Sequence, residues 1–374
     1  MIGDTRIMGD QTYGRGLEGL IAGETNIGKI DGTSGKLWYR GYTIQDLCQH
    51  SNFEEVSYLI IHGDLPKVAE LKAWTDELIE WRQPPRDALS VLQWLPRDAH
   101  PLMKYRTMLS VAACLMPEGE NNRLDAQWRR PARIMAWSSA LAAAAIRHMS
   151  GEPPVPDDPS LDFSINFLWQ SLGQVPSKSA SRAFEVSLIA QAEHGLHAAA
   201  LAALTTISTG ADLGSAVLAG MGALSGKKHG GANQDAFEMI DRLNSDAEAK
   251  TWVNSKLDER YRFPGFGHRV YKTHDPRLKI IEPLAHDLLE KTDNIQLWTR
   301  YQIIKNKIEL QLGSKGVFAN IDAVTGLIYY PVGLPIQSFP IPFALAIQVG
   351  WIAHCLEYIP TGKMIEPGSV YIGE

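Results

Sequence analysis

Apolar residues that recur every three or four positions restrict the fold of this sequence more than any other feature. Leu213, Val217, Met221 and Leu224 share one face of a helix, and Asp212 precedes them in the N-cap position. A period of 3.6 residues matches an α-helix with one buried face and does not match a strand, whose side chains alternate. The pattern therefore predicts a helical protein.

The same helical signal recurs along the chain, whereas strand signals are few. Alanine-rich runs at 139–146 and 198–204 suit closely packed core helices, and 235–243 repeats the apolar period. Short extended pieces are predicted within 20–41, joined by a Gly-Thr-Ser-Gly turn at 32–35. We predict an all-α protein with two domains. The amino-acid composition along the chain does not reveal the boundary between them.

One predicted helix carries proline near its start. Asp275 and Pro276 are predicted to be its N-cap and first residue, and Ile281 and Leu288 lie on its apolar face. Pro283 lacks an N–H and crowds the preceding turn, so we expect it to kink or shorten this helix.

Composition excludes several classes of function. The 374 residues carry a net charge of -6 with a pI near 6.0, which gives extended nucleic-acid binding no electrostatic support. The three cysteines, Cys48, Cys114 and Cys355, form no CxxC pair, so neither a disulfide framework nor a cysteine zinc site is expected.

Targeting signals are also weak. The first ten residues contain acids where a signal peptide would need an apolar run. The apolar stretch 334–355 is broken by Pro340, Pro342, Gln337 and Gln348, which argues against a membrane span. We expect a cytoplasmic protein that does not bind membranes.

Glycine-flanked segments concentrate the side chains that could carry chemistry. His229 follows Lys227 and Lys228 and precedes two glycines at the start of a predicted helix. Backbone amides there would keep the imidazole neutral, so that it could donate to a developing oxyanion. Taken alone, His229 is equally compatible with a histidine that caps a turn.

The segment FPGFGHRVYKTHDPR, 263–277, combines close backbone approach with positive charge. Gly265 and Gly267 admit a ligand, and its cations, together with Arg262 just before it, suit phosphate or carboxylate. The cations should lower the pKa of His268. The alternative is a structural histidine in a solvated basic loop.

Two further positions complete the set. Asp322 lies in an apolar run, where burial would raise its pKa and make it a better base, although a helix cap is the alternative. His194 and His197 are three residues apart and are predicted to share one face of a helix. No further metal-ligand pattern accompanies them, so we do not expect a metal site. These residue types suit removal of a proton beside a carbonyl, with a phosphorylated carrier in the basic loop.

The chain resembles the citrate synthase family over nearly its whole length. The motifs are HGGAN at 229–233, GFGHRVYK at 265–272, DPR at 275–277 and ANIDAVTG at 319–326. The resemblance implies an all-α fold with a large domain (1–230 and 334–374), a small closing domain (231–333) and a homodimer. It also implies condensation of an acyl-CoA with a 2-oxo acid or related carbonyl acceptor, followed by thioester hydrolysis.

Roles follow from the matching motif positions. The resemblance implies that Asp322 is the base, that His229 donates to the enol oxygen and that His268 polarises the acceptor carbonyl. His194 and Arg277 would bind the acceptor carboxylate. No covalently bound cofactor is implied, because coenzyme A enters as the thioester substrate. The residues implied in CoA binding are Arg262, Phe263, Pro264, Gly265, Gly267, Lys272 and Lys315.

Departures from the family pattern concern the acceptor. Ile347 stands where an oxaloacetate-binding arginine is expected, and Glu366-Pro367-Gly368 replaces R-P-R, whose arginine is contributed across the dimer. Gln191 replaces a histidine, Gly195 an acid and His197 an asparagine. Each lost charge-assisted bond is worth about 1.5–3 kcal/mol, so we expect an acceptor with one carboxylate and an uncharged far end.

Three alternatives remain open from the sequence. The protein could be a genuine citrate or 2-methylcitrate synthase that binds the second carboxylate with other arginines. It could retain only hydrolysis or cleavage of a CoA thioester. It could also be a non-catalytic, CoA-binding regulatory protein, although Asp322, His229 and His268 are all retained.

Overall fold

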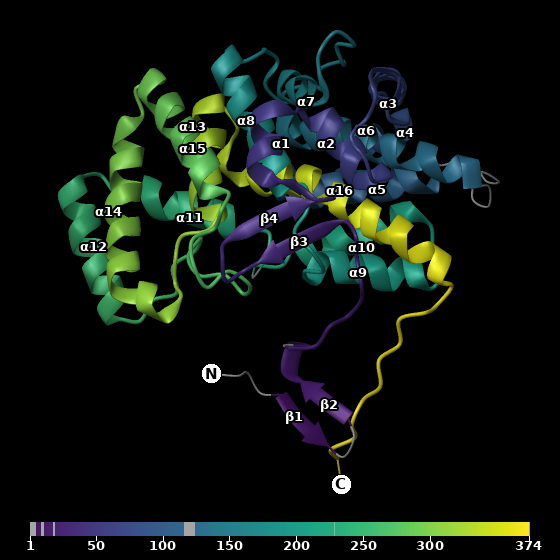
Figure 1. The fold of residues 1–374 in the computed structure, drawn as a ribbon. Coiled ribbons are helices and arrows are strands. Elements are labelled where there is room, and N and C mark those ends of the chain that lie inside the picture. The colour runs from purple at the N-terminus through teal and green to yellow at the C-terminus, as the bar shows by residue number, and fades with distance from the viewer. Residues whose placement is uncertain (1–4, 9–10, 18, 116–123, 228, 374) are drawn as a thin grey trace.

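The computed structural model describes residues 5–8, 11–17, 19–115, 124–227 and 229–373, and helices dominate it (Figure 1). Residues 1–4 and Lys228, used in the sequence predictions, lie outside this part. The α-helices are α1 (Ile44–His50), α2 (Phe53–His62), α3 (Val68–Glu80), α4 (Arg86–Ser90), α5 (Pro101–Cys114), α6 (Leu124–Met149), α7 (Phe163–Leu172), α8 (Lys178–Gln191), α9 (Ala198–Ser208), α10 (Leu213–Leu224), α11 (Ala232–Asp241), α12 (Asp246–Asp258), α13 (Leu278–Lys291), α14 (Ile295–Leu312), α15 (Asp322–Val332) and α16 (Pro340–Tyr358). The strands are β1 (Thr5–Met8), β2 (Gln11–Gly14), β3 (Gly28–Asp31), β4 (Lys36–Tyr39) and β5 (Tyr42–Thr43), and short 3₁₀ turns are η1 (Arg15–Leu17), η2 (Val91–Trp94), η4 (Gly313–Lys315), η5 (Ile336–Ser338) and η6 (Ile359–Thr361).

The predicted all-α class is confirmed. Asp212 caps α10, since its carboxylate accepts from the Ser215 N–H at 2.9 Å. The alanine-rich runs lie within α6 and α9, and 235–243 falls mostly within α11. The early extended pieces are β3 and β4, which pair antiparallel across the predicted turn at 32–35.

Helix α16 passes through the centre of the core. The segment Ile336–Thr361 is long and apolar enough to span a membrane, but 89% of its apolar 18-residue window is buried inside the protein, as expected for a core helix. Within the described residues it is the single such segment. Glycines let neighbours approach it: a Cβ on Gly220 of α10 would lie 2.8 Å from the Trp351 ring.

Helices α11 to α15 gather on one side of the molecule, drawn in green in Figure 1. Within this group α12 packs on α14 and α13 packs on α15, while α13 and α15 both contact α8 in the rest of the protein. The division into 1–230 with 334–374 and 231–333 stays a prediction.

The β3–β4 hairpin supports a loop more than two hundred residues away in the chain. The Lys272 N–H donates to the Gly32 carbonyl at 3.0 Å. A Cβ on Gly32 would lie 2.2 Å from the Val270 carbonyl oxygen, so no side chain fits at this turn. The hairpin therefore holds the segment that contains His268.

Three helix predictions differ from the structure in detail. Helix α13 begins at Leu278 with Arg277 as its N-cap residue, so Asp275 and Pro276 precede the helix, and the Asp275 carboxylate accepts from both the backbone N–H and the side chain of Arg277. Pro283 lies inside α13, which continues to Lys291, so it does not shorten the helix, and the predicted kink stays a prediction. The residues after α8 are not helical, since the backbone turns through Gly195 at φ +66.

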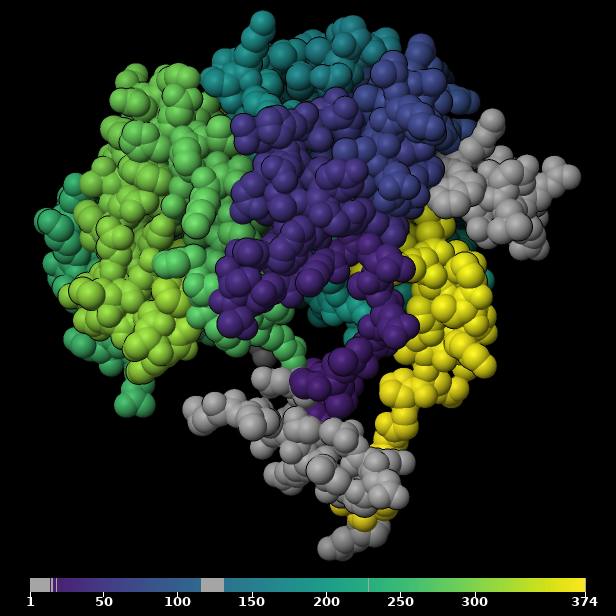
Figure 2. All heavy atoms as spheres, in the orientation of Figure 1, coloured from purple at the N-terminus to yellow at the C-terminus, as the bar shows by residue number. Residues whose placement is uncertain are grey.

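The end of the chain leaves the helical body. Residues after η6 carry no regular secondary structure and extend away from it, as the yellow segment in Figures 1 and 2 shows. Apolar side chains on this segment face solvent, with Met364 56% exposed and Ile372 92% exposed.

Candidate active site

The start of α15 and the loop at 263–267 form one backbone unit. Phe266 and Ala319 pair as an isolated β-bridge, and the Gly267 N–H donates to the Phe318 carbonyl at 2.8 Å. A Cβ on Gly265, whose φ is +76, would lie 2.7 Å from the Cα of Ala323. Only glycine permits this approach, so the loop and the helix start are fixed together.

Asn320 links this unit to Asp322. Its Nδ2 donates to the Gly267 carbonyl at 2.9 Å, and its Oδ1 accepts from the Asp322 N–H at 3.0 Å. Burial raises the pKa of Asp322 to about 6, with the nearby Arg277 opposing the shift and Asp275 adding to it. The predicted rise in pKa is confirmed, and Asp322 is poised to accept a proton near neutral pH.

Asp275 and Arg277 form a buried ion pair beside Asp322. Arg277 Nε and Nη2 donate to the two carboxylate oxygens of Asp275 at 2.9 and 2.7 Å. Asp275 also accepts from the Ile321 N–H at 3.1 Å, which ties the pair to the start of α15. Burial opposes the ionisation of Asp275, but the pair with Arg277 lowers its pKa overall. Arg277 is thus held rigidly, charged and next to Asp322.

His268 is fixed in one tautomer. Its Nδ1 accepts from the backbone N–H groups of Val270 and Tyr271 at 3.0 and 3.1 Å. Burial, with Arg277 adding to the effect, lowers its pKa to about 4. The predicted direction is confirmed, with burial as the larger cause. The neutral ring therefore carries its proton on Nε2, where it can donate to a substrate.

His194 lies against His268, as the predicted site requires. The two ring centroids are 5.0 Å apart, and His194 Nε2 is 3.2 Å from the Tyr271 hydroxyl. Burial lowers the pKa of His194 well below its usual value, with Arg277 and His268 adding to the effect. His194 is therefore neutral.

His229 lies in a second cluster with His197. Its Nε2 is 3.0 Å from Nδ1 of His197, and its ring centroid is 6.3 Å from that of Phe343. Burial lowers its pKa, which agrees with the neutral histidine predicted. His197 also contributes to the lowered pKa of His194, so the two clusters are within electrostatic reach.

The residues predicted to bind CoA surround the loop unit. Phe263 is buried, whereas Arg262, Lys272 and Lys315 are exposed. Gly316, which follows Lys315, lies beside Lys272, since a Cβ there would be 3.9 Å from the Lys272 Cα. Cationic side chains therefore border the loop, although their part in binding stays a prediction.

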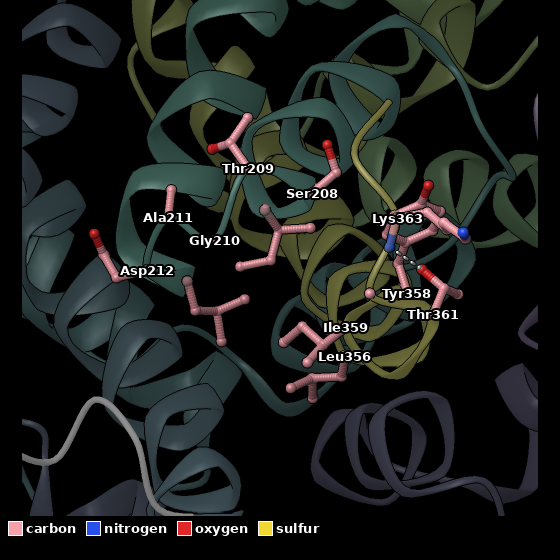
Figure 3. A pocket seen from close by; sticks show the side chains of 13 residues that line it. Ser208, Thr209, Gly210, Ala211, Asp212, Leu356, Tyr358, Ile359, Thr361 and Lys363 are labelled. Atoms are coloured by element: carbon pink, nitrogen blue, oxygen red, sulfur yellow. Dashed lines mark hydrogen bonds between the residues drawn. The ribbon is translucent and has the colours of Figure 1, made fainter. Parts of the chain in front are cut away.

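The histidines are not arranged for a metal. His194 and His197 point to different partners, Tyr271 and His229, and the described residues contain no group of three or more His, Cys, Asp or Glu suited to an ion. A cavity of about 530 Å³ lies elsewhere, between the α9–α10 turn and the end of α16 (Figure 3). None of the predicted site residues lines it.

Comparison with known proteins places this geometry in a family. Residues 16–368 match the model of the citrate synthase C-terminal domain. The chain is 36% identical to the citrate synthase of Haloferax volcanii over 96% of each chain, and 34% identical to the 2-methylcitrate synthase of Mycobacterium tuberculosis over 96% of this chain and 90% of that protein. It belongs to the citrate synthase family.

Solved citrate synthases have the same fold. That of Thermoplasma acidophilum, in a ternary complex with carboxymethyl coenzyme A and oxaloacetate, superimposes with a TM-score of 0.92 at 29% identity over 96% of each chain. That of Pyrobaculum aerophilum gives 0.91 at 30% identity over 100% of this chain and 95% of that one. The citrate synthase fold predicted from the motifs is confirmed.

Ile347, where the sequence resemblance leads us to expect an arginine, lies on the face of α16 that is turned toward the His229 cluster. Ile347 lies one turn from both Phe343 and Trp351 on α16. Phe343 packs near His229, and the Trp351 Nε1–H donates to His197 at 3.3 Å. Residues four apart share a helix face, so Ile347 faces the same side with an apolar side chain. Residues 366–368 lie on the extended C-terminal segment.

The sequence does not single out several residues of this candidate site. Tyr271 and Asn320 position the predicted residues, and Trp351 comes from the core helix α16. The DPR motif did carry a signal for Asp275, because a carboxylate two residues from an arginine can pair with it. Nothing in the spacing connects Trp351 with His197.

Proposed function

We propose that this citrate synthase family member joins a short acyl-CoA to a 2-oxo acid and then hydrolyses the thioester. The observation that carries the proposal is the single hydrogen-bonded unit in which Asn320 and Asp275 hold Asp322 and Arg277 beside the 263–267 loop. A base of raised pKa and a fixed cation suit enolate formation next to a bound carboxylate.

The chemistry follows from the residues. Asp322 takes a proton from the carbon next to the thioester carbonyl, and His229 donates a hydrogen bond to the enolate oxygen. His268 donates through Nε2 to the acceptor carbonyl, while Arg277 and His194 bind the adjacent carboxylate. The enolate carbon then bonds to the carbonyl carbon, and the resulting alkoxide takes up a proton. Water cleaves the thioester and releases the CoA thiol.

The comparisons support oxaloacetate as the acceptor. Relatives at 34–36% identity are named citrate and 2-methylcitrate synthases, and the Thermoplasma enzyme was solved with carboxymethyl coenzyme A and oxaloacetate. Acetyl-CoA or propionyl-CoA would then be the donor. This is our first candidate function.

A specific observation favours a second candidate with the same chemistry. Ile347, between Phe343 and Trp351, is 1% exposed and puts a buried apolar side chain where the family pattern has an arginine. An acceptor with one carboxylate and an uncharged far end would suit an apolar residue at this position, because a second carboxylate left unpaired there would be costly. Pyruvate or a larger 2-oxo monoacid is the corresponding acceptor.

One experiment separates these functions. Thiol release from acetyl-CoA and propionyl-CoA is followed with oxaloacetate, pyruvate or larger 2-oxo monoacids, and the product mass is read from the same samples. Citrate or methylcitrate supports the first candidate, whereas activity confined to a monoacid supports the second.

Control samples distinguish the remaining alternatives. Thiol release without any acceptor would indicate a thioester hydrolase. CoA binding with no turnover of any donor would indicate a regulatory protein, and Asp322→Ala would then have no effect on its behaviour.

We also propose a homodimer in the cytoplasm. The apolar side chains of the extended C-terminal segment, such as Met364, Val370 and Ile372, lack cover within one chain and suit a second copy. Light scattering after gel filtration tests this assembly: the full chain should elute as a dimer, and a chain ending at 362 should shift toward monomer. A monomeric full chain would contradict the proposal.

A further inference from the structure

Trp351 of the core helix α16, His197 and His229 form a line of three hydrogen-bonded aromatic side chains. The indole Nε1–H of Trp351 is 3.3 Å from Nε2 of His197, and Nδ1 of His197 is 3.0 Å from Nε2 of His229. His197 and His229 meet edge to face, with ring centroids 5.0 Å apart and an interplanar angle of 70°. The indole nitrogen of Trp351, both ring nitrogens of His197 and Nε2 of His229 are therefore paired along one line of hydrogen bonds.

The donor at one end fixes the direction of both hydrogen bonds. An indole nitrogen can only donate, so Nε2 of His197 is an acceptor and carries no proton. A neutral His197 then carries its proton on Nδ1 and donates it to Nε2 of His229. That nitrogen must be unprotonated in turn, which leaves the proton of a neutral His229 on Nδ1.

The surroundings keep both rings neutral. Burial lowers the pKa of His197 to about 3, and the neighbouring His229 and His354 add to the effect. Burial also lowers the pKa of His229, while an interaction with its own backbone opposes the shift.

We propose that His197, oriented by Trp351, is a positioning residue that fixes His229 in the tautomer with its proton on Nδ1. The part of this inference that concerns catalysis rests on the proposed function: the enolate oxygen would be met by the Nδ1–H of His229. Without His197 the proton could move to Nε2 and the donor would point away from the enolate.

The residue at 197 is suited to this task in this chain. An asparagine side chain can place its amide nitrogen near the position of a histidine Nδ1, whereas a glutamine amide reaches the position of Nε2. His197→Asn should therefore keep a donor to His229, and His197→Gln should lose it while keeping a polar group near Trp351. This pair of variants separates the hydrogen bond to His229 from simple filling of space.

The first measurement is the tautomer itself and needs no activity. Protein labelled with ¹⁵N-histidine is examined by long-range ¹H–¹⁵N NMR, and the His229 signals are assigned from their loss in His229→Gln. We expect a protonated Nδ1 in the wild type and in His197→Asn. His197→Gln and Trp351→Phe should shift His229 partly or wholly to the Nε2–H form. A wild-type Nε2–H form, or no change in His197→Gln, would overturn the proposal.

The second measurement is steady-state kinetics with the acyl-CoA and acceptor that turn over. For His197→Gln we expect kcat to fall roughly tenfold or more with little change in KM, approaching the loss of about 10²–10³ seen when an oxyanion donor is removed. His197→Asn should recover most of this loss. Equal kinetic losses in both variants would contradict a role through the Nδ1 hydrogen bond.

The two measurements test the proposed function and the role of His197 independently. If no donor and acceptor pair gives thiol release in the wild type, the proposed function is wrong, and the NMR result alone then decides the tautomer. If turnover is normal but His229 keeps its tautomer in His197→Gln, the proposed function stands and the role of His197 is wrong.

Discussion

Asp322, the proposed base, would combine a catalytic task with a cost in stability. Burial raises the pKa of its carboxyl from 3.8 to about 6, so the folded protein disfavours the charged form that the proposed reaction requires. The unfolded chain releases this proton at lower pH than the folded chain. Stability from this group is therefore lost as pH rises from about 4 to 6, and the full cost is present above that range.

Asp322→Asn should exchange activity for stability. A shift of this size corresponds to roughly 2–3 kcal/mol, at about 1.36 kcal/mol per pKa unit. At pH 8 we expect the variant to have a higher Tm than the wild type, and this difference should shrink toward pH 4.5. Because the variant cannot abstract a proton, its kcat should fall by about 10²–10⁴. Thermal melts across this pH range and the thiol-release assay measure both effects. An unchanged Tm at pH 8 would show that the carboxylate is solvated.

His268 gives a second prediction at this scale. Two backbone N–H groups occupy Nδ1, so Nε2 is the nitrogen that would donate to the proposed acceptor. His268→Ala should reduce kcat/KM by about 10²–10³, the usual effect of losing one such donor. His268→Gln should lose less, because its amide nitrogen can replace Nε2. Equal losses in the two variants would argue against donation from Nε2.

The 263–267 loop and the start of α15 are held together as one structural unit. The bridge between Phe266 and Ala319 and the hydrogen bonds of Asn320 join the predicted CoA loop to the predicted base. A shift of the loop should therefore disturb Asp322 as well as CoA binding.

Gly265→Ala should be much more harmful than an ordinary glycine substitution. The new Cβ would lie 2.7–2.8 Å from three atoms of Ala323, in addition to the strain of φ +76. Gly41→Ala is the matched control, since its φ is +90 and nothing lies within 4 Å. We expect the control to cost about 1 kcal/mol and Gly265→Ala several times more. Urea unfolding and the KM for acyl-CoA test this, and equal costs would contradict the close approach.

The buried pair of His354 and Glu193 should affect the stability of the whole molecule. His354 of α16 and Glu193 after α8 are 2% and 1% exposed, and His354 Nε2 is 3.1 Å from a carboxylate oxygen of Glu193. Glu193 also accepts from the Gly195 N–H, which holds the turn between His194 and His197. Burial opposes the charge on His354, but Glu193 raises its pKa above 6.5 overall.

This pair predicts a loss of stability on the alkaline side. A folded-state pKa above the unfolded value gives stability that is fully present below pH 6.5 and is lost as pH rises through the folded pKa. Urea unfolding at pH 6 and pH 9 should show this decline in the wild type. His354→Gln keeps a neutral donor and should be less stable at pH 6, with a flatter pH dependence. A wild type equally stable at both values would indicate that His354 is neutral.

The sequence by itself determined the helical class, the cap at Asp212 and the motifs that identify the family, because these depend on local period and short-range chemistry. Burial of Asp322 followed from its apolar neighbours. Residues such as His229 and His268 were recognised as candidates for the same reason, since they stand in short glycine-rich motifs.

Only the tertiary structure decided which partners these residues have. Asp275 pairs with Arg277 just before α13, and the turn at Gly195 directs His194 and His197 to different neighbours. Trp351 reaches His197 from a helix that begins well over a hundred residues later in the chain. Such contacts depend on how whole helices pack, and the spacing of residues along the chain carries no record of them.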